Sequence, residues 1–158
     1  EEKARRLLTK KLNMRAEKDG LDFDCFRAVV GNTFDAHRLS KFARARGVDM
    51  TGSLFDACFR DGRDLSDHAV LKSLAEEAGL GGKDTESVLN GSDYASDVRR
   101  DEDEAARFGI RAVPYFGVDR TYGISGMKSL TLFRYALKDL LRKANIGYTS
   151  PAVENDGE

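Results

Sequence analysis

Only three short segments of this chain have the residue pattern of a β-strand, and the other periodic segments are patterned for helices. Apolar residues alternate with aspartates from Leu21 to Cys25, which predicts a short strand over residues 21–27. Residues 110–118 and 121–124 flank a tight turn, which predicts a β-hairpin. Two or three short strands cannot make a well-protected sheet, because an isolated hairpin is marginal in water. We therefore expect a mostly helical α/β protein whose small sheet either lacks strands or is covered by something else.

Glycines and capping residues divide the rest of the chain into amphipathic helices. Asn32, for example, is a strong N-cap for a helix that ends before Gly47. The predicted helices cover residues 3–18, 33–46, 51–59, 67–78, 85–89, 93–108 and 129–144. The chain thus divides into a helical region with one short strand (1–109), a strand-strand-helix unit (110–145) and a polar tail (146–158).

The charge balance and the apolar pattern exclude two classes of partner. The 158 residues include 26 basic and 27 acidic side chains, so the net charge is -1. This balance lacks the basic excess of a protein that binds phosphates, and we expect no nucleic-acid partner. No apolar run approaches the ~20 residues of a membrane-spanning helix, and we expect no membrane partner. The opening EEKARRLLTKK has no apolar central region, so it does not predict a secretory signal, and we expect a cytoplasmic location.

The chain has two cysteines, Cys25 and Cys58, far apart in sequence. Two thiols do not make a disulfide scaffold, and a structural zinc site needs more ligands than these. His37 and His68 do not lie at ligand spacing from either cysteine, so we expect no metal site. We expect two free thiols in a reducing compartment, not bonded to each other.

A first candidate site lies in the run NTFDAHRL, residues 32–39, at the start of the second predicted helix. A helix N-terminus presents free backbone N–H groups, so a ligand carboxylate could bind beside Asn32. His37 and Arg38 would then face a polar surface or a groove. The alternative is a well-capped helix with a surface histidine.

A second candidate site is the segment that runs from Ile110 to Phe116 and includes Pro114. A proline at the start of a buried strand is unusual, because it removes a ladder donor. One explanation is a cis Val113–Pro114 bond with the Val113 backbone turned outward, where an extended peptide could add as a strand. The other is an ordinary trans proline at a strand start, since cis bonds are a minority.

Four runs in this order, NTFDAHRL, LFDACFRDGRDLSD, AVPYF and YGISG before the last helix, resemble the FrnE-like branch of the DsbA family. Members of that family are thiol-disulfide oxidoreductases with a thioredoxin-like fold and a helical insertion domain. The resemblance extends from about Leu8 to Leu141, and NTFDAHRL is its most specific part. It implies that the helical region is the insertion and that the strand-strand-helix unit is the C-terminal half of the thioredoxin-like domain.

The resemblance also assigns site residues. It implies that Pro114 is the cis proline beside the family's active site, and that Ala112 and Val113 present their backbone to the substrate. With Asn32 and His37 from the first site, the expected substrate-binding residues are Ala112, Val113, Pro114, Asn32 and His37. The expected substrate is a protein or peptide thiol or disulfide.

The chain departs from the family in one respect that affects its chemistry. The family's redox pair is a Cys-x-x-Cys at the start of its first helix, and neither cysteine here is in such a motif. We expect that the family's N-terminal strand-helix-strand part is absent, that this chain has no catalytic residue, and that it is inactive alone. Neither cysteine is predicted at a helix N-terminus, which would lower its pKa.

Two alternatives remain open from the sequence. A relative of the glutathione-dependent isomerases and transferases would have the same fold and would hold the cofactor glutathione against Val113. A non-catalytic binding module would instead pair the exposed edge of the truncated sheet with a second chain. Since two copies of one patch close about a two-fold axis, we expect a homodimer through that sheet.

Overall fold

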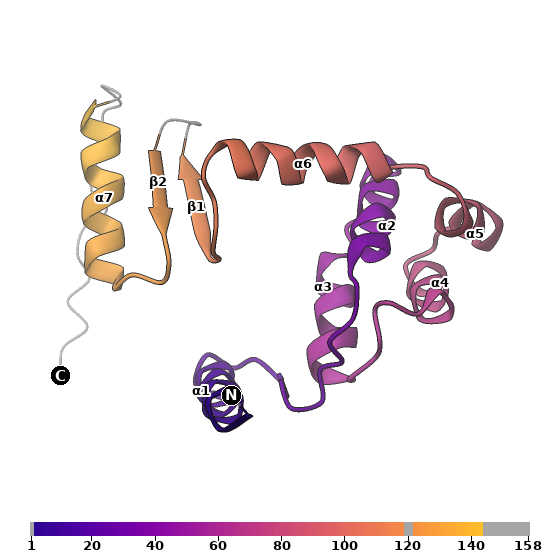
Figure 1. Cartoon of the computed structure of the whole chain (residues 1–158), viewed down its shortest axis with the longest axis horizontal. Helices are drawn as coiled ribbons and strands as arrows, with labels where there is room; N and C mark the ends of the chain where they lie inside the picture. Colours follow the sequence, from indigo (N-terminus) through magenta and orange to yellow (C-terminus); the bar gives the residue numbers. More distant parts are fainter. Residues whose placement is uncertain (1, 119–121, 144–158) are drawn as a thin grey trace. The chain divides into compact units, whose positions relative to one another are not determined.

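The computed structural model describes residues 2–118 and 122–143, and Figure 1 shows the order of their helices and strands. The chain divides into two compact units, one up to Glu104 and one from Ala105 onward. Helix α6 (Ala95–Arg107) contains the point of division.

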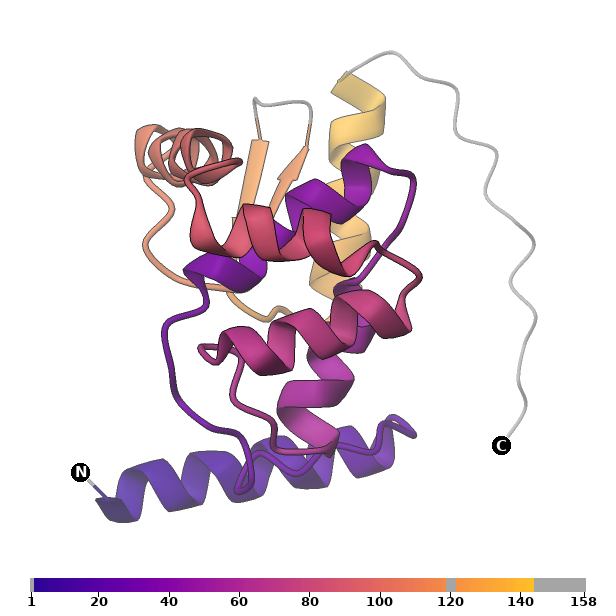
Figure 2. The same ribbon diagram turned by 90° about the vertical axis from the view of Figure 1, so that its right-hand side faces the viewer.

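The first unit is helical. Its elements are α1 (Glu2–Lys18), α2 (Phe34–Ala45), α3 (Thr51–Phe55), the π-helix η1 (Asp56–Arg60), α4 (His68–Glu77), α5 (Gly82–Asn90) and most of α6. Helices α2, α4 and α5 pack against one another, as Figure 2 shows. The core lies among them because each helix turns its apolar stripe inward. Its largest buried apolar side chains are Phe42, Leu39, Met50 and Leu71.

The predicted strand over residues 21–27 is wrong. These residues form an irregular segment that ends in a turn. The Asp24 side chain accepts a hydrogen bond from the backbone N–H of Phe26, at 3.0 Å, which bends the chain there. Asn13 of α1 accepts from the backbone N–H of Cys25, at 2.9 Å. These local hydrogen bonds use backbone groups that would otherwise pair with a neighbouring strand. Among the described residues, the sheet contains only the two strands of the hairpin.

Several helix boundaries also differ from the prediction. The helix expected over residues 51–59 changes at Asp56 from α3 into η1, in which each turn holds an extra residue. The helix expected over residues 67–78 begins one residue later, because Asp67 is its cap and its side chain accepts from the N–H of Ala69. The predicted tail 146–158 lies outside the described residues.

The second unit is a β-hairpin followed by a helix. Strands β1 (Tyr115–Val118) and β2 (Tyr122–Ser125) pair antiparallel, and α7 (Leu130–Lys143) follows. The rings of Phe116 on β1 and Phe133 on α7 pack edge to face, with centroids 5.0 Å apart. No residue described in α7 is fully buried, so this unit has a thin core. Within the described ranges, no helix has both the length and the apolar character needed to cross a bilayer.

Candidate functional site

The segment before β1 exposes its backbone. Ala112, Val113 and Pro114 form a bend, and all three are exposed, with Val113 at 87%. The Val113–Pro114 peptide bond is cis. The backbone N–H of Gly126 donates to the carbonyl oxygen of Pro114, at 2.8 Å, which holds the segment beside the end of β2. The backbone of Val113 forms no hydrogen bond with another described residue, and a bound peptide could pair with its N–H and carbonyl groups.

The start of α2 is capped from within the chain. The Asn32 side chain accepts a hydrogen bond from the backbone N–H of Phe34, at 2.9 Å. Helix α2 begins one residue later than expected, with Thr33 at the cap position, and Asn32 still satisfies its first N–H. An anion at this helix end would therefore have to compete with Asn32 for the Phe34 N–H. His37 is exposed on the next turn of the helix.

His37 lines a pocket between α2 and the α3–η1 segment. The pocket has a volume of about 290 Å³. Polar side chains line part of its wall and apolar ones the rest; the polar set is Thr33, His37, Ser40 and Thr51, and the apolar set is Ala36, Leu54, Phe55, Cys58, Phe59 and Leu65. A pocket of mostly apolar lining with a few polar groups is typical of a small-ligand site.

Arg38 does not face a polar groove, which corrects the prediction for this residue. Its side chain is only 4% exposed, and its guanidinium donates to the backbone carbonyl oxygens of Val88, Gly91 and Asp93. A guanidinium offers five donors in a fixed fork, and here they satisfy carbonyls at and beyond the end of α5. Arg38 therefore positions α5 against α2 and does not contact a ligand.

Asp35 joins Arg38 to His68, the first residue of α4. One carboxylate oxygen accepts from Arg38 at 2.8 Å, and the other lies 2.8 Å from Nε2 of His68. Burial alone would raise the pKa of the Asp35 carboxyl, but the hydrogen bonds from His68 and Arg38 and the charges of both lower it below its usual value. Sequence reasoning missed this cluster. The spacing of Asp35 and Arg38 indicated a pair on one helix face, whereas His68 is too distant in sequence to be paired by pattern.

Both cysteines are free, as expected, and half-buried. The pKa of the Cys58 thiol is raised, first by burial and then by the negative charge of a nearby Cys25 thiolate. A raised pKa leaves little reactive thiolate near neutral pH. Within the described residues, no group of three or more His, Cys, Asp or Glu side chains could hold a metal ion.

The sequence of the chain matches one known protein family. The family model for a DSBA-like thioredoxin domain matches residues 2–138. The chain belongs to the DSBA-like thioredoxin domain family. A search of curated proteins gave no match.

Membership in the DSBA-like family confirms the predicted class, a thioredoxin-like, mostly helical α/β fold. The predicted site residues fall in both units of this DSBA-like chain. Asn32 and His37 lie at the start of α2 in the first unit, and Ala112–Pro114 lie before β1 in the second. The structure thus gives two separate candidate surfaces, an exposed backbone segment and a pocket, each complete within its own unit.

Proposed function

We propose that this chain is the substrate-holding part of a FrnE-like thiol-disulfide oxidoreductase. Membership in the DSBA-like family supports the class of reaction. The runs NTFDAHRL and YGISG support the FrnE-like branch. The observation that carries the proposal is the exposed backbone of Val113, which has no hydrogen-bond partner among the described residues and lies two residues before β1.

An extended peptide would bind this segment by strand addition. The N–H and carbonyl groups of Val113 would exchange hydrogen bonds with the peptide backbone, which gives affinity without requiring a particular substrate sequence. Pro114 has no N–H to offer, so the contact would be limited to the residues before it. This mode suits a protein that acts on many cysteine-containing substrates.

The redox step of this class is a thiol-disulfide exchange. A thiolate attacks one sulfur of the substrate disulfide, forms a mixed disulfide and releases the other sulfur as a thiolate. The attacking pair of the family is a Cys-x-x-Cys, and Cys25 and Cys58 are not spaced in that way. The part played by this chain is therefore to hold the substrate strand, and we expect no turnover by the chain alone.

The pocket at His37 is the proposed second contact surface. Its apolar wall, which includes Leu54 and Phe55, suits an apolar side chain, and His37 supplies a polar group at the wall. Asn32 supports this surface by capping α2.

A cytoplasmic location, where thiols stay reduced, would keep Cys25 and Cys58 free.

Peptide binding by two variants of the full chain tests the proposal. The probe is a short fluorescein-labelled peptide with alternating apolar side chains and no cysteine, followed by fluorescence anisotropy. Val113→Pro removes the backbone N–H and should weaken binding about tenfold, whereas Val113→Ala keeps it and should bind within about threefold of the original chain. Equal binding by both variants, with unchanged circular dichroism, would contradict the proposal.

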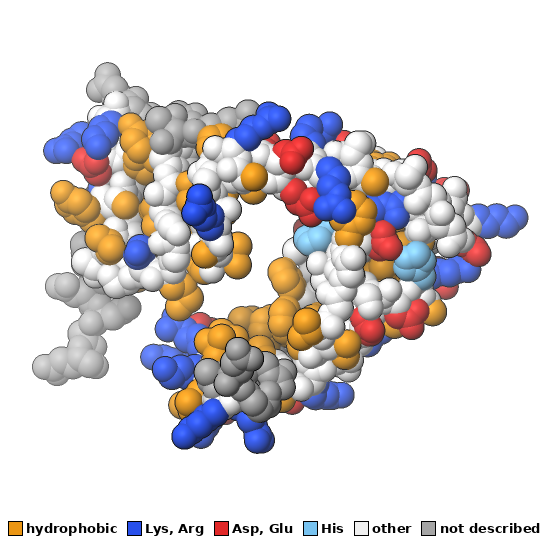
Figure 3. Space-filling view, viewed as in Figure 1, with side chains coloured by type: hydrophobic (Ala, Val, Ile, Leu, Met, Phe, Trp, Pro, Cys, Tyr) orange, Lys and Arg blue, Asp and Glu red, His pale blue; other side chains and the backbone are white. Residues whose placement is uncertain are grey.

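A second candidate function, a dimerising module, is favoured by the exposed apolar side chains of the second unit. Among the described residues these are Phe108, Val113, Phe116, Tyr122, Met127, Leu130, Leu132 and Tyr135. Figure 3 shows hydrophobic side chains on the visible surface of this unit. Both strands of the two-stranded sheet are edges, which can pair with another chain.

A glutathione-dependent isomerase is the third alternative, and displacement of the labelled peptide by reduced glutathione would favour it.

A further inference from the structure

Cys25 and Cys58 come from distant parts of the sequence, and the fold places their segments side by side. The backbone N–H of Asp24 donates to the carbonyl oxygen of Phe59, at 2.7 Å. The rings of Phe23 and Phe59 stack, with centroids 5.1 Å apart. Each cysteine is the immediate sequence neighbour of one partner in that backbone bond, so the backbones of Cys25 and Cys58 come close together at this junction.

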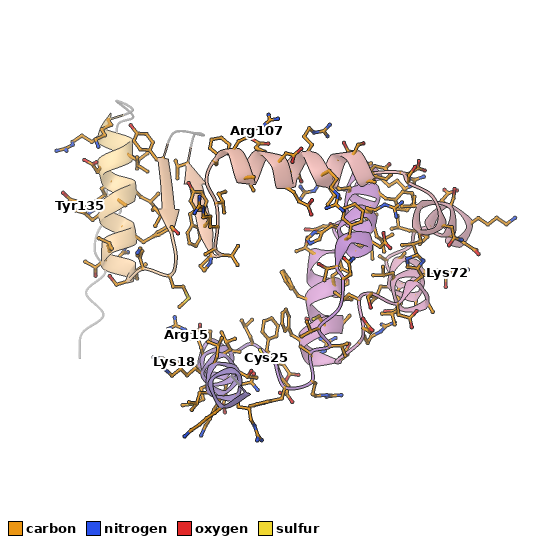
Figure 4. All side chains as sticks on the ribbon, in the orientation of Figure 1. Arg15, Lys18, Cys25, Lys72, Arg107 and Tyr135 are labelled. Atoms are coloured by element: carbon orange, nitrogen blue, oxygen red, sulfur yellow. The ribbon has the colours of Figure 1, made fainter. Side chains whose placement is uncertain are left out.

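The segment around Cys25 is held at this junction on both sides. Asn13 of α1 accepts from the Cys25 N–H at 2.9 Å and donates to the Asp24 carboxylate at 3.0 Å. Beyond the turn, Gly62 approaches the backbone of Arg27 so closely that an added Cβ would lie 3.0 Å from the Arg27 carbonyl oxygen. Figure 4 shows Cys25 between α1 and the end of the α3–η1 segment.

The state of the two thiols supports a direct relationship between them. Both are half-buried, so they are neither on the open surface nor sealed in the core. Burial raises the pKa of the Cys58 thiol, and the negative charge of a Cys25 thiolate raises it further. The proposed substrate contact at Val113 uses neither thiol.

We propose that Cys25 and Cys58 are a redox modification site that closes to a reversible disulfide when the chain meets a low-molecular-weight disulfide, such as oxidised glutathione. This site is distinct from the family's Cys-x-x-Cys chemistry. The held segment and the backbone bond between Asp24 and Phe59 carry the proposal, because a disulfide forms only between cysteines whose backbones are already close.

Oxidised glutathione accepts the two electrons that the two thiols lose when they form a disulfide. The Cys25 thiolate attacks one sulfur of oxidised glutathione, the glutathione S–S bond breaks, and one glutathione thiolate leaves. The Cys58 thiolate then attacks the Cys25 sulfur of the mixed disulfide and releases the second glutathione. The chain loses two electrons and two protons, and one oxidised glutathione becomes two reduced ones. The raised pKa of Cys58 lowers the fraction of its thiolate that is available for this second attack.

Closure would also affect the pocket at His37. Cys58 is one of the residues that line it, and the disulfide would tie this wall to the segment that α1 holds through Asn13. The modification would thus remove a free thiol from the pocket and fix η1 in place.

Oxidation of the full chain with oxidised glutathione, followed by alkylation and mass spectrometry, tests the site. The expected product is lighter by two hydrogens, carries no glutathione and yields a cross-linked peptide containing Cys25 and Cys58. Since the link closes a loop of the unfolded chain, the melting temperature should rise by on the order of 5–10 °C. Cys25→Ser and Cys58→Ser are the matched controls, and neither should show this rise.

The same oxidation in concentrated urea shows whether the fold brings the thiols together. The cross-link should form at least about tenfold more slowly in the unfolded chain, because loop closure then costs entropy. Stable glutathione adducts on both cysteines of the folded chain, or links only between two chains, would overturn the proposal. Equal rates of internal cross-linking in the folded and unfolded chain would do the same.

Discussion

The ring of Tyr115 occupies the space in which a side chain on Gly123 would have to lie. A Cβ built on Gly123 would be 1.9 Å from the Tyr115 hydroxyl oxygen and 2.5 Å from the ring carbon that carries it. Gly123 faces Gly117 across the hairpin, and a Cβ on Gly117 would meet the Tyr115 ring only at 3.9 Å. A side chain is therefore sterically blocked at Gly123 but accommodated at Gly117, although the two glycines face each other in the hairpin.

This contact predicts that Gly123→Ala weakens the hairpin. The methyl group would force the Tyr115 ring to move, and such overpacking costs about 1–3 kcal/mol of unfolding free energy. Gly117→Ala is the matched control, since its methyl group is accommodated at ordinary contact distance. Urea unfolding followed by tyrosine fluorescence compares the two, and equal stability of both variants would show that the ring does not hold this position.

Arg38 is predicted to be a major determinant of stability in the helical unit. Arg38→Met would leave the carbonyl oxygens of Val88, Gly91 and Asp93 without their buried donor and should cost about 3 kcal/mol or more. Arg46→Met is the control, because the ion pair of Arg46 with Asp84 is exposed and contributes about 0–1 kcal/mol. The Arg46 guanidinium also lies over the Phe42 ring, 3.8 Å from its centroid, a contact that contributes about 0.5–1 kcal/mol at an exposed site. Chemical denaturation measures both, and a loss no larger for Arg38 than for Arg46 would contradict the structural role.

The Asp35 carboxylate predicts a pH dependence of stability. Its pKa in the folded chain is lowered, so the unfolded chain binds a proton more readily, and ionised Asp35 stabilises the fold above its unfolded pKa of about 3.9. That contribution is lost as the pH falls through the folded pKa. The stability difference between the original chain and Asp35→Asn should therefore be present above about pH 4 and shrink as the pH falls below it, where Asp35 takes up a proton. A difference that grows as the pH falls below about 4 would reverse the sign and refute the assignment.

Dithiol catalysis by the chain alone is predicted to be absent. Reduction of insulin disulfides needs an accessible thiolate that can reach a protein disulfide and a resolving thiol that reacts quickly, whereas both cysteines are half-buried and the pKa of Cys58 is raised. In the turbidity assay with dithiothreitol, the chain should not exceed the uncatalysed rate. A faster rate that disappears in Cys25→Ser or Cys58→Ser would show that these thiols turn over substrate.

We expect the chain to self-associate through its second unit. Apolar side chains such as Leu130 and Tyr135 are well exposed on α7, and both strands offer open edges. Sedimentation at micromolar concentration should show a dimer, and Leu130→Lys with Tyr135→Lys should shift it toward monomer. A monomer of 17.5 kDa for the unmodified chain would rule the association out.

The sequence predicted the helices and the hairpin well because their signals are local. Apolar periodicity and glycine stops define α2 and α7, and the residue types of β1 and β2 define the hairpin. It failed at residues 21–27, where alternation suggested a strand, because the side chain of Asn13 on α1 takes the Cys25 N–H that a ladder would use.

The candidate site was predictable only in part, because only some of its residues carry signals in their own segment of the sequence. Pro114 and the run from Asn32 to His37 carry signals in their own residues. The burial of Arg38 depends on carbonyl groups far along the chain, in and after α5, and the closeness of Cys25 and Cys58 depends on a backbone bond between Asp24 and Phe59. No pattern within one segment contains such long-range contacts.

Hydrogen–deuterium exchange at the Val113 amide tests the central claim most directly. Without ligand, this amide is exposed and has no acceptor among the described residues, so it should exchange at close to the rate of an unstructured chain. Saturation with the extended peptide should slow its exchange by at least about tenfold, because strand addition gives it a carbonyl partner. Unchanged exchange at Val113 in the presence of bound peptide would contradict the account.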